Sequence, residues 1–230
     1  MSTAALIVAA GRGVRFGGDT PKQFAPLGGK PLLFHSIEIF EHMAEFDQIR
    51  LVLPSDFAVG FESRFDLSPY KKIVGWVAGR ARRQDSVWTG LSNLPDNVNL
   101  VAIHDAVRPC PQQSDIREAL KRANHMGAAI LAAPLVDTVK RCDADGRVIK
   151  TIAREQLWLA QTPQIFRLDL IRHAYAKVFE DDVEVTDDAA AVERLGKPVE
   201  VVQSSWPNPK ITTQDDLAFA EWLLRKEECL

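Results

Sequence analysis

Glycines and basic side chains alternate near the amino terminus, a composition that suits phosphate binding. Within residues 9–24, four glycines are interleaved with Arg12, Arg15 and Lys22. Glycine lets backbone N–H groups approach a phosphate closely. The segment is not a P-loop, because no Gly-Lys-Ser/Thr ends it, and Phe16 stands where a dinucleotide-binding fingerprint needs its third glycine. Alone, the segment fits an anion-binding loop and a solvated surface loop equally well.

A second cationic segment, residues 79–86, carries Arg80, Arg82 and Arg83 at the start of a predicted helix. The amino terminus of a helix disfavours positive charge, so these arginines are poorly placed for stability unless an anion binds there. A solvent-facing basic turn is the alternative.

Asp105 follows an apolar, strand-like run and is the acid best placed for chemistry. A carboxylate at the end of a strand suits a Mg²⁺ ion shared with phosphates. Arg108 is near enough in sequence to pair with Asp105, so a purely structural ion pair is the alternative. His104 continues the apolar run. We expect a partly buried, hydrogen-bonded histidine there rather than a catalytic base, because no nucleophile stands near it.

Several other polar positions are weak indicators when each is taken alone. They are Thr138 and Lys140 within 137–140, Lys210 within 208–210, and Arg154, Thr162 and Thr186. The sequence has no Ser/His/Asp nucleophile elbow, HExxH motif or EF-hand loop.

Short apolar runs alternate with amphipathic segments, which predicts strands alternating with helices. The predicted strands cover residues 4–9, 49–53, 72–78, 100–104, 128–133 and 199–202, and the predicted helices cover 31–43, 55–65, 83–94, 114–127, 168–178, 187–195 and about 214–225. Ser55, Ser114 and Thr186 are predicted N-caps, and Thr213 with Asp216 a capping box. Residues 136–141 and 147–152 flank a turn at 143–146 and predict a β-hairpin.

This alternation predicts the α/β fold class, with a Rossmann-like, mostly parallel sheet and helices on both faces. We expect a single domain over residues 1–230, from which a β-hairpin arm protrudes at about 134–160. In such sheets ligands bind outside the carboxyl ends of the strands. The polar segments described above follow predicted strands, so we expect them to meet at that edge.

Positive charge is therefore predicted to concentrate in one place on a slightly acidic protein. The chain has 28 basic and 31 acidic residues, a formal net charge of −3, which disfavours a general nucleic-acid binder. A cleft lined by Arg15, Lys22, Arg83, Arg108 and Lys210 with one acid indicates a small polyanionic ligand. Phosphoryl or nucleotidyl transfer needs mainly positioning and charge neutralisation, which such a cleft supplies.

Composition and cysteine usage set limits on location. No apolar run approaches the ~20 residues of a membrane span, so no membrane association is expected. The amino terminus has no basic segment before its apolar run, which disfavours a secretory signal. Cys110, Cys142 and Cys229 are odd in number and form no CxxC pair, which favours reduced thiols in the cytoplasm.

The ordered set of motifs resembles the 2-C-methyl-D-erythritol 4-phosphate cytidylyltransferase family over essentially the whole chain. The matching segments are Ala9-Ala10-Gly11 with Arg15, Pro21-Lys22-Gln23, Arg83-x-x-Ser86, His104-Asp105-x-x-Arg108-Pro109, Asp137-Thr138-x-Lys140, Arg154-x-x-Leu157-Trp158, Thr162-Pro163-Gln164, Thr186-Asp187 and Asn208-x-Lys210. The resemblance implies a nucleotidyltransferase fold and the joining of CTP to methylerythritol phosphate, with Mg²⁺, to give CDP-methylerythritol and pyrophosphate. Because the sequence ends soon after the last predicted helix, we expect no fused second enzyme.

The resemblance also assigns roles to residues. Those it implies for the transfer itself are Arg15, Lys22, Arg154 and Lys210, with Arg154 and Lys210 near the phosphate of the acceptor. Those it implies for the nucleotide are Ala9, Ala10, Gly11, Gly79, Arg83 and Ser86. Those it implies for the acceptor are Asp105, which also faces the metal, and Arg108, Thr138, Thr162 and Thr186. It further implies a homodimer made by the hairpin arm, with a site shared between the two chains.

Three rival interpretations remain at this point. A ribitol 5-phosphate cytidylyltransferase would act on a similar short polyol phosphate with overlapping residues. A dinucleotide-binding oxidoreductase is disfavoured by the missing third glycine and by the missing acid about 20 residues further on. A non-catalytic nucleotide sensor would bind CTP and release no pyrophosphate.

Overall fold

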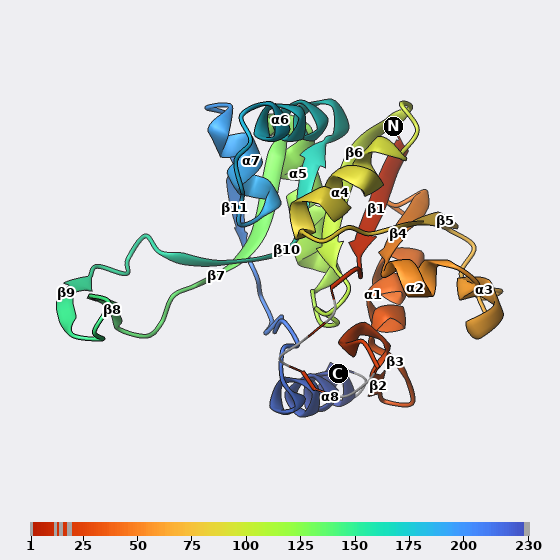
Figure 1. Cartoon of the computed structure of the whole chain (residues 1–230), viewed down its shortest axis with the longest axis horizontal. Coiled ribbons are helices and arrows are strands. Elements are labelled where there is room, and N and C mark those ends of the chain that lie inside the picture. The colour runs from red at the N-terminus through yellow and green to blue at the C-terminus, as the bar shows by residue number, and fades with distance from the viewer. Residues whose placement is uncertain (1, 12, 14–15, 18–19, 228–230) are drawn as a thin grey trace.

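A seven-stranded sheet forms the centre of the computed structural model, which describes residues 2–11, 13, 16–17 and 20–227. The strand order is β11-β7-β10-β6-β1-β4-β5 (Figure 1). The strands are β1 Ser2–Val8, β4 Gln48–Leu53, β5 Ile73–Ala78, β6 Val98–Asp105, β7 Ala128–Pro134, β10 Trp158–Arg167 and β11 Glu200–Gln203. All of them run parallel except β10, so the predicted mostly parallel sheet is confirmed.

Strand β10 is the element that the sequence pattern did not predict. It lies between β6 and β7 and runs antiparallel to both. The apolar residues 158–160 and 165–166 are separated by three polar residues and Pro163, and the proline interrupts any strand pattern. The pairing with β7 shifts register between Ala160 and Gln164, where this proline lies. The irregularity accommodates Pro163 inside a central strand.

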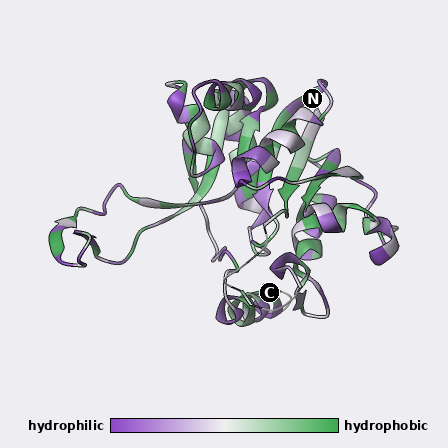
Figure 2. Ribbon diagram, in the orientation of Figure 1, coloured by the Kyte–Doolittle hydropathy of each residue, from purple (hydrophilic) through white to green (hydrophobic). Residues whose placement is uncertain are grey.

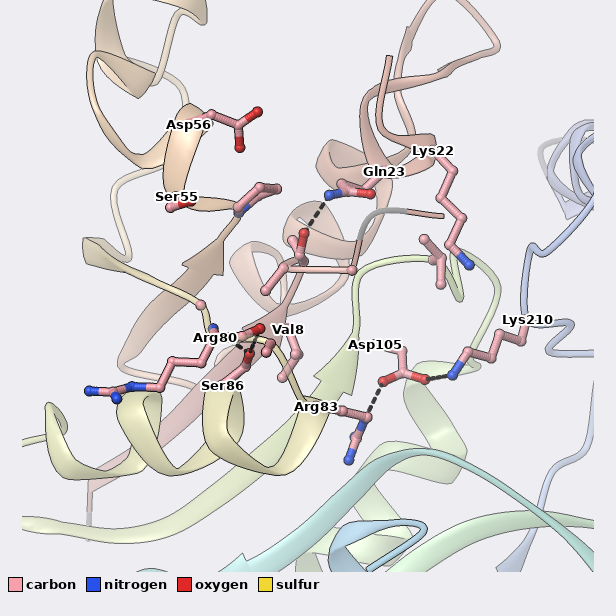
Figure 3. A pocket seen from close by; sticks show the side chains of 17 residues that line it. Val8, Lys22, Gln23, Ser55, Asp56, Arg80, Arg83, Ser86, Asp105 and Lys210 are labelled. Carbon is pink, nitrogen blue, oxygen red and sulfur yellow. Dashed lines mark hydrogen bonds and ion pairs between the residues drawn. The ribbon is translucent and has the colours of Figure 1, made fainter. Parts of the chain in front are cut away.

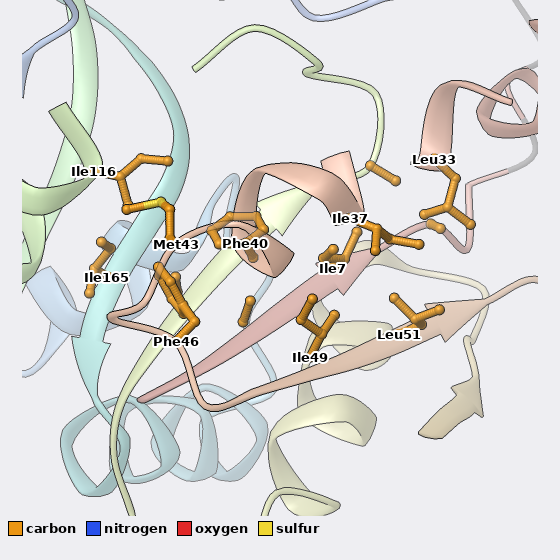
Figure 4. Close-up of a cluster of buried hydrophobic side chains, with 14 of the residues drawn as sticks. Ile7, Leu33, Ile37, Phe40, Met43, Phe46, Ile49, Leu51, Ile116 and Ile165 are labelled. Carbon is orange, nitrogen blue, oxygen red and sulfur yellow. The ribbon is translucent and has the colours of Figure 1, made fainter. Parts of the chain in front are cut away.

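Helices cover both faces of the sheet, as predicted. The side chains of β1 alternate, so that Ala5 and Ile7 face one cluster while Ala4 and Leu6 face the other. The first face is covered by α1 Leu32–Glu41 and α5 Gln113–Met126, and the second by α4 Arg83–Ser92, α6 Leu168–Glu180 and α7 Asp188–Arg194. Figure 4 shows side chains of the first cluster, and in Figure 2 the hydrophobic colour concentrates along the central strands. Burial on both faces explains the continuous apolar runs.

A third, smaller cluster lies beyond the carboxyl ends of the strands. It joins α8 Gln214–Glu227 to the short strands β2 Pro26–Leu27 and β3 Lys30–Pro31 through Leu27, Ile211 and Leu223. The single turn η1 Lys22–Phe24 leads into β2. The predicted capping box of α8 is confirmed, because Asp216 N–H donates to Thr213 Oγ1 (3.2 Å) and Thr213 N–H donates to Asp216 Oδ2 (2.8 Å).

Some predicted helix ends are wrong. Residues 55–65 form two short helices, α2 Ser55–Ala58 and α3 Phe61–Arg64, because Gly60 adopts a left-handed φ of 70° between them. Neither Ser55 nor Ser114 is an N-cap, since Pro54 and Gln112 hold those positions. Thr186 is not an N-cap either. Asp187 caps α7, with its carboxylate accepting from Ala190 N–H.

The predicted hairpin projects away from the main sheet (Figure 1). It pairs β8 Val139–Cys142 with β9 Val148–Ile152 in a separate two-stranded sheet. Its turn is closed by hydrogen bonds between Asp143 and Arg147, with Gly146 at a φ of 80°. Val136 (72% exposed) and Ile149 (59% exposed) leave apolar surface uncovered along this arm. Among the helices in the described part of the chain, none has the length and apolar character needed to cross a membrane.

Candidate active site

A pocket of about 650 Å³ opens at the carboxyl ends of β1, β4, β5 and β6 (Figure 3). The edge is the one at which an open parallel sheet binds ligands. The residues that line it are Val8, Ala9, Ala10, Gly11, Lys22, Gln23, Pro54, Ser55, Asp56, Gly79, Arg80, Ala81, Arg83, Ser86, Asp105, Val107 and Lys210. The structure therefore brings together most of the nucleotide-binding residues that the sequence suggested.

At one end of the pocket two backbone segments of its wall are in close contact. A Cβ added to Gly79 would lie 2.1 Å from Ala10 Cβ and 3.1 Å from Ser86 Oγ, so the two loops approach as closely as glycine allows. Gln23 Nε2 donates to the carbonyl of Ala9, and Ser86 Oγ accepts from Arg80 N–H at 2.8 Å. Side chains from two neighbouring elements thus hold the backbone of both walls.

The other end of the pocket gathers charge. Asp105, the last residue of β6, accepts from Lys210 Nζ at 2.7 Å and from Arg83 Nε at 3.2 Å. Lys22 lies on the same side in Figure 3, with Nζ donating to the carbonyl of Ile211 at 2.9 Å. Arg83 and Lys210 therefore pair with one carboxylate, and Lys22 lies on the same side of the pocket, a composition that suits a polyphosphate.

The charge state of Asp105 follows from these neighbours. Burial raises the pKa of a carboxyl group, but here the positive charges of Arg83 and Lys210 outweigh burial and lower the pKa of Asp105 well below its usual range. The carboxylate is therefore ionised at neutral pH. Within the described residues no group of three or more His, Cys, Asp or Glu side chains could hold a metal ion by itself. A Mg²⁺ ion fits here only if bound phosphates supply the other ligands, which is how Mg²⁺ commonly binds nucleotides.

The arginines at the start of α4 do not depend on a bound anion. Arg82 pairs with Asp85 (2.8 Å), and Arg80 Nε donates to Thr89 Oγ1 (3.1 Å). Arg83 pairs with Asp188 as well as with Asp105. The alternative of a solvent-facing basic turn fits Arg80 and Arg82, which are exposed, whereas Arg83 pairs with acids on β6 and α7.

The predicted Arg108–Asp105 pair does not form. Arg108 Nη1 donates to the backbone carbonyl of Asn208 at 2.7 Å, while Lys210 and Arg83 occupy the carboxylate. Arg108 therefore holds the loop that carries Lys210, although its side chain does not line the pocket.

His104 is buried and hydrogen-bonded, as predicted, and more completely than expected. Its Nε2 lies 2.9 Å from the carbonyl of Arg108, and its Nδ1 lies 3.1 Å from Thr162 Oγ1. Thr162 Oγ1 also accepts from Asp105 N–H at 3.0 Å, so Thr162 supports the strand end from beneath the pocket. Burial lowers the pKa of His104 to about 4, against an effect of Asp105 in the other direction.

Other predicted site residues lie elsewhere. Thr138 and Arg154 are exposed on the arm, where Arg154 Nη1 donates to the carbonyl of Val136, and Thr186 is exposed just before α7. None of these three lines the pocket. Arg15 falls outside the described residues.

Sequence reasoning missed several pocket residues. Ser55 and Asp56 follow the carboxyl end of β4, so the rule that selected the other loops could have found them. Gln23 adjoins Lys22 but gave no separate signal. Asp188 lies behind Arg83, and no local pattern marks it, since it is one of two adjacent acids at a helix start.

Comparison with known proteins agrees with this geometry. The family model described as IspD, 2-C-methyl-D-erythritol 4-phosphate cytidylyltransferase, matches residues 3–226. A protein of that name from Syntrophus aciditrophicus is 43% identical over 226 residues, covering 97% of this chain and 96% of the relative.

Solved structures agree as well. A 4-diphosphocytidyl-2C-methyl-D-erythritol synthase from Anaerococcus prevotii superposes with a TM-score of 0.84 at 30% identity, covering 97% of this chain and 96% of that one. The Francisella tularensis 2-C-methyl-D-erythritol 4-phosphate cytidylyltransferase gives a TM-score of 0.81 at 33% identity, covering 96% of this chain and 100% of that one.

A mostly parallel α/β sheet with a cationic pocket at its carboxyl edge suits a nucleotidyltransferase, the class to which the relatives described above belong. More specifically, the chain belongs to the 2-C-methyl-D-erythritol 4-phosphate cytidylyltransferase family. The relatives described above carry that activity in their names, so the ribitol phosphate and oxidoreductase interpretations are not favoured.

The buried His104 generates a prediction for stability against pH. Between about pH 6.5 and pH 4 the unfolded chain binds a proton at this imidazole and the native protein does not. The contribution of His104 is therefore present above that window and is lost as the pH falls through it, by about 1.4 kcal/mol per pH unit. Urea unfolding at successive pH values measures this slope.

The matched variants are His104→Gln and His173→Gln, the latter at an exposed histidine of α6. We expect His104→Gln to flatten the slope and His173→Gln to leave it unchanged. Parallel slopes for His104→Gln and the wild type would show that the imidazole is not the group responsible.

Proposed function

We propose that this chain transfers the cytidylyl group of CTP to 2-C-methyl-D-erythritol 4-phosphate in isoprenoid precursor biosynthesis. The observation that carries the proposal is the charged end of the pocket, where Arg83 and Lys210 pair with the ionised Asp105 and Lys22 lies on the same side, in a chain of this family. A phosphate oxygen of the acceptor attacks the α-phosphorus of CTP. The bond from that phosphorus to the oxygen bridging the β-phosphate breaks, and pyrophosphate leaves. The enzyme forms no covalent intermediate in this scheme.

The protein's part in this reaction is to position and to neutralise charge. The base of the nucleotide would lie against the wall formed by Ala10 and Gly79, with Ala9, Gly11 and Ser86 holding the nucleotide. Lys22, together with Arg15, stabilises the negative charge that builds on the α-phosphate. Preorganised donors of this kind are often the largest single catalytic contribution.

A divalent cation is part of the proposal. Asp105 would hold Mg²⁺ together with the phosphates of CTP, and the ion would neutralise charge on the leaving pyrophosphate. The support is the ionised carboxylate of Asp105 at the end of β6, beside the pocket in which the phosphates of the nucleotide would lie.

The acceptor would bind where Lys210 meets the arm of a second chain. Arg108, Thr162 and Lys210 lie at or beneath the pocket, whereas Thr138 and Arg154 are carried outward on the arm. We infer a homodimer in which each arm, with its uncovered apolar side chains, completes the partner's site. A cytoplasmic location stays a prediction from the cysteine usage.

Product analysis tests the assignment. Pyrophosphate release from CTP is measured with 2-C-methyl-D-erythritol 4-phosphate and with ribitol 5-phosphate, each with Mg²⁺ and with excess chelator. We expect rapid release with methylerythritol phosphate and Mg²⁺, and little in the other three mixtures. Faster pyrophosphate release with ribitol 5-phosphate would show that this compound is the acceptor instead. CTP binding without pyrophosphate release in all four mixtures would indicate a nucleotide sensor.

Lys22→Ala tests the role of the lysine at the charged end. We expect kcat to fall by a factor on the order of 10²–10³, because one transition-state donor is lost, while CTP binding largely persists. Steady-state kinetics and CTP titration measure the two quantities. The control is Lys30→Ala, at a lysine that pairs with Glu38 outside the pocket and should leave kcat near its wild-type value. Near-wild-type turnover of Lys22→Ala would contradict the assignment.

Mixed dimers test the shared site. Lys22→Ala and Arg154→Ala should each be nearly inactive alone. After subunit exchange in equal amounts, half of the dimers combine the two variants, and each of these has one intact site. Activity should recover to roughly a quarter of the wild-type value if two-fold dimers form this site. Recovery that fails although native mass spectrometry shows exchanged dimers would place Arg154 and Lys22 in the same chain's site.

A further inference from the structure

Asp188, the first residue of α7, is fully buried behind the pocket. It is 0% exposed, and it does not line the pocket. Its carboxylate accepts two parallel hydrogen bonds from Arg83, from Nη1 at 3.0 Å and from Nη2 at 2.8 Å. It also accepts from the hydroxyl of Tyr175, on α6, at 2.6 Å. One buried carboxylate therefore joins three helices.

These bonds fix the plane of the Arg83 guanidinium. Two parallel N–H···O bonds give a defined orientation as well as energy, because the guanidinium fork matches a carboxylate. With one N–H of Nη1 and one of Nη2 bonded to Asp188, Nε donates to Asp105 Oδ1 at 3.2 Å. Asp188 thus determines how Arg83 meets the carboxylate at the floor of the pocket.

The pairing of Asp188 with Arg83 also affects the charge of the site. Arg83 and Lys210 carry two positive charges, and Asp105 and Asp188 carry two negative ones. Burial lowers the pKa of the Arg83 guanidinium, but the negative charges of Asp188 and Asp105 outweigh this and raise it well above its usual value. If Asp188 were neutral, Asp105 would be the remaining one of these two acids to pair with Arg83. The Arg83 guanidinium would then be free to turn toward a bound phosphate.

We propose that Asp188 is a positioning residue for the transfer reaction, acting through Arg83 on Asp105. The inference rests on the proposed function of the pocket. Its alternative is that Asp188 only anchors α7 to α4 and α6. The two differ in what they predict for nucleotide binding.

The test is Asp188→Asn, which keeps the shape of the side chain and removes its charge. We expect kcat to fall about tenfold or more, the range found when residues that orient a site's ligands are replaced. Binding of CTP, titrated in the absence of acceptor, should be unchanged or tighter, because removing a buried negative charge makes the pocket more positive. A loosened fold would instead weaken CTP binding along with kcat.

Two further variants separate an effect of Asp188 through Arg83 from a loss of stability. Val178→Ala removes buried volume from α6 in the same cluster without touching a charge, so it should lower the melting temperature and leave kcat unchanged. In an Arg83→Met background, Asp188→Asn should lower kcat no further, because nothing remains to be oriented. If Asp188→Asn alone does not fold, the double variant, which buries no unpaired charge, is measured by itself, and a kcat within twofold of wild type overturns the inference.

The inference is overturned if kcat of Asp188→Asn stays within twofold of wild type. It is also overturned if CTP binding weakens in proportion to kcat, or if Asp188→Asn lowers kcat further in the Arg83→Met background. A wild-type enzyme that releases no pyrophosphate would contradict the proposed function itself, whereas an active wild type with an unaffected Asp188→Asn contradicts this inference alone.

Discussion

The site depends on one buried carboxylate that two cations keep ionised. Asp105 ends β6, Arg83 begins α4, and Lys210 follows β11, so the three charges meet only when the sheet and its connections are complete. The buried charge of Asp105 would be costly alone, and the two cations compensate it. The consequence is a pocket that presents fixed charge to a ligand without having to reorganise.

The sheet supplies the rigidity that this arrangement needs. Strands β1 and β6 lie in its middle and are buried on both faces, so the loops that follow them start from well-defined points. The backbone of the pocket wall is then held at Ala9 by a hydrogen bond from Gln23 and at Arg80 by a hydrogen bond to Ser86. The irregular strand β10 contributes as well, since Thr162 beneath the pocket accepts from the backbone of Asp105. Apolar packing and hydrogen bonds therefore both fix the backbone at the ends of β1 and β6, where the pocket lies.

The arm follows a different physical logic. It buries little of its own apolar surface, and Val136 and Ile149 remain uncovered in the isolated chain. A two-stranded hairpin of this kind is marginally stable by itself in water. Its exposed side chains and its distance from the central sheet suit contact with a second chain better than contact with its own core.

Local chemistry in the sequence determined the alternation of elements, the capping box of α8, the hairpin turn at 143–146 and the glycine-rich walls of the pocket, because each depends on neighbouring residues. The tertiary structure decided what depends on long-range contact. It placed β10 in the centre of the sheet, although Pro163 interrupts the strand pattern of its sequence. It also paired Arg83 with Asp188, 105 residues away in the sequence. Asp105 forms its ion pair with Lys210 and not with Arg108, which is nearer in the sequence. Sequence patterns report the preferences of adjacent residues, whereas the partner of a buried charge is set by which elements pack together.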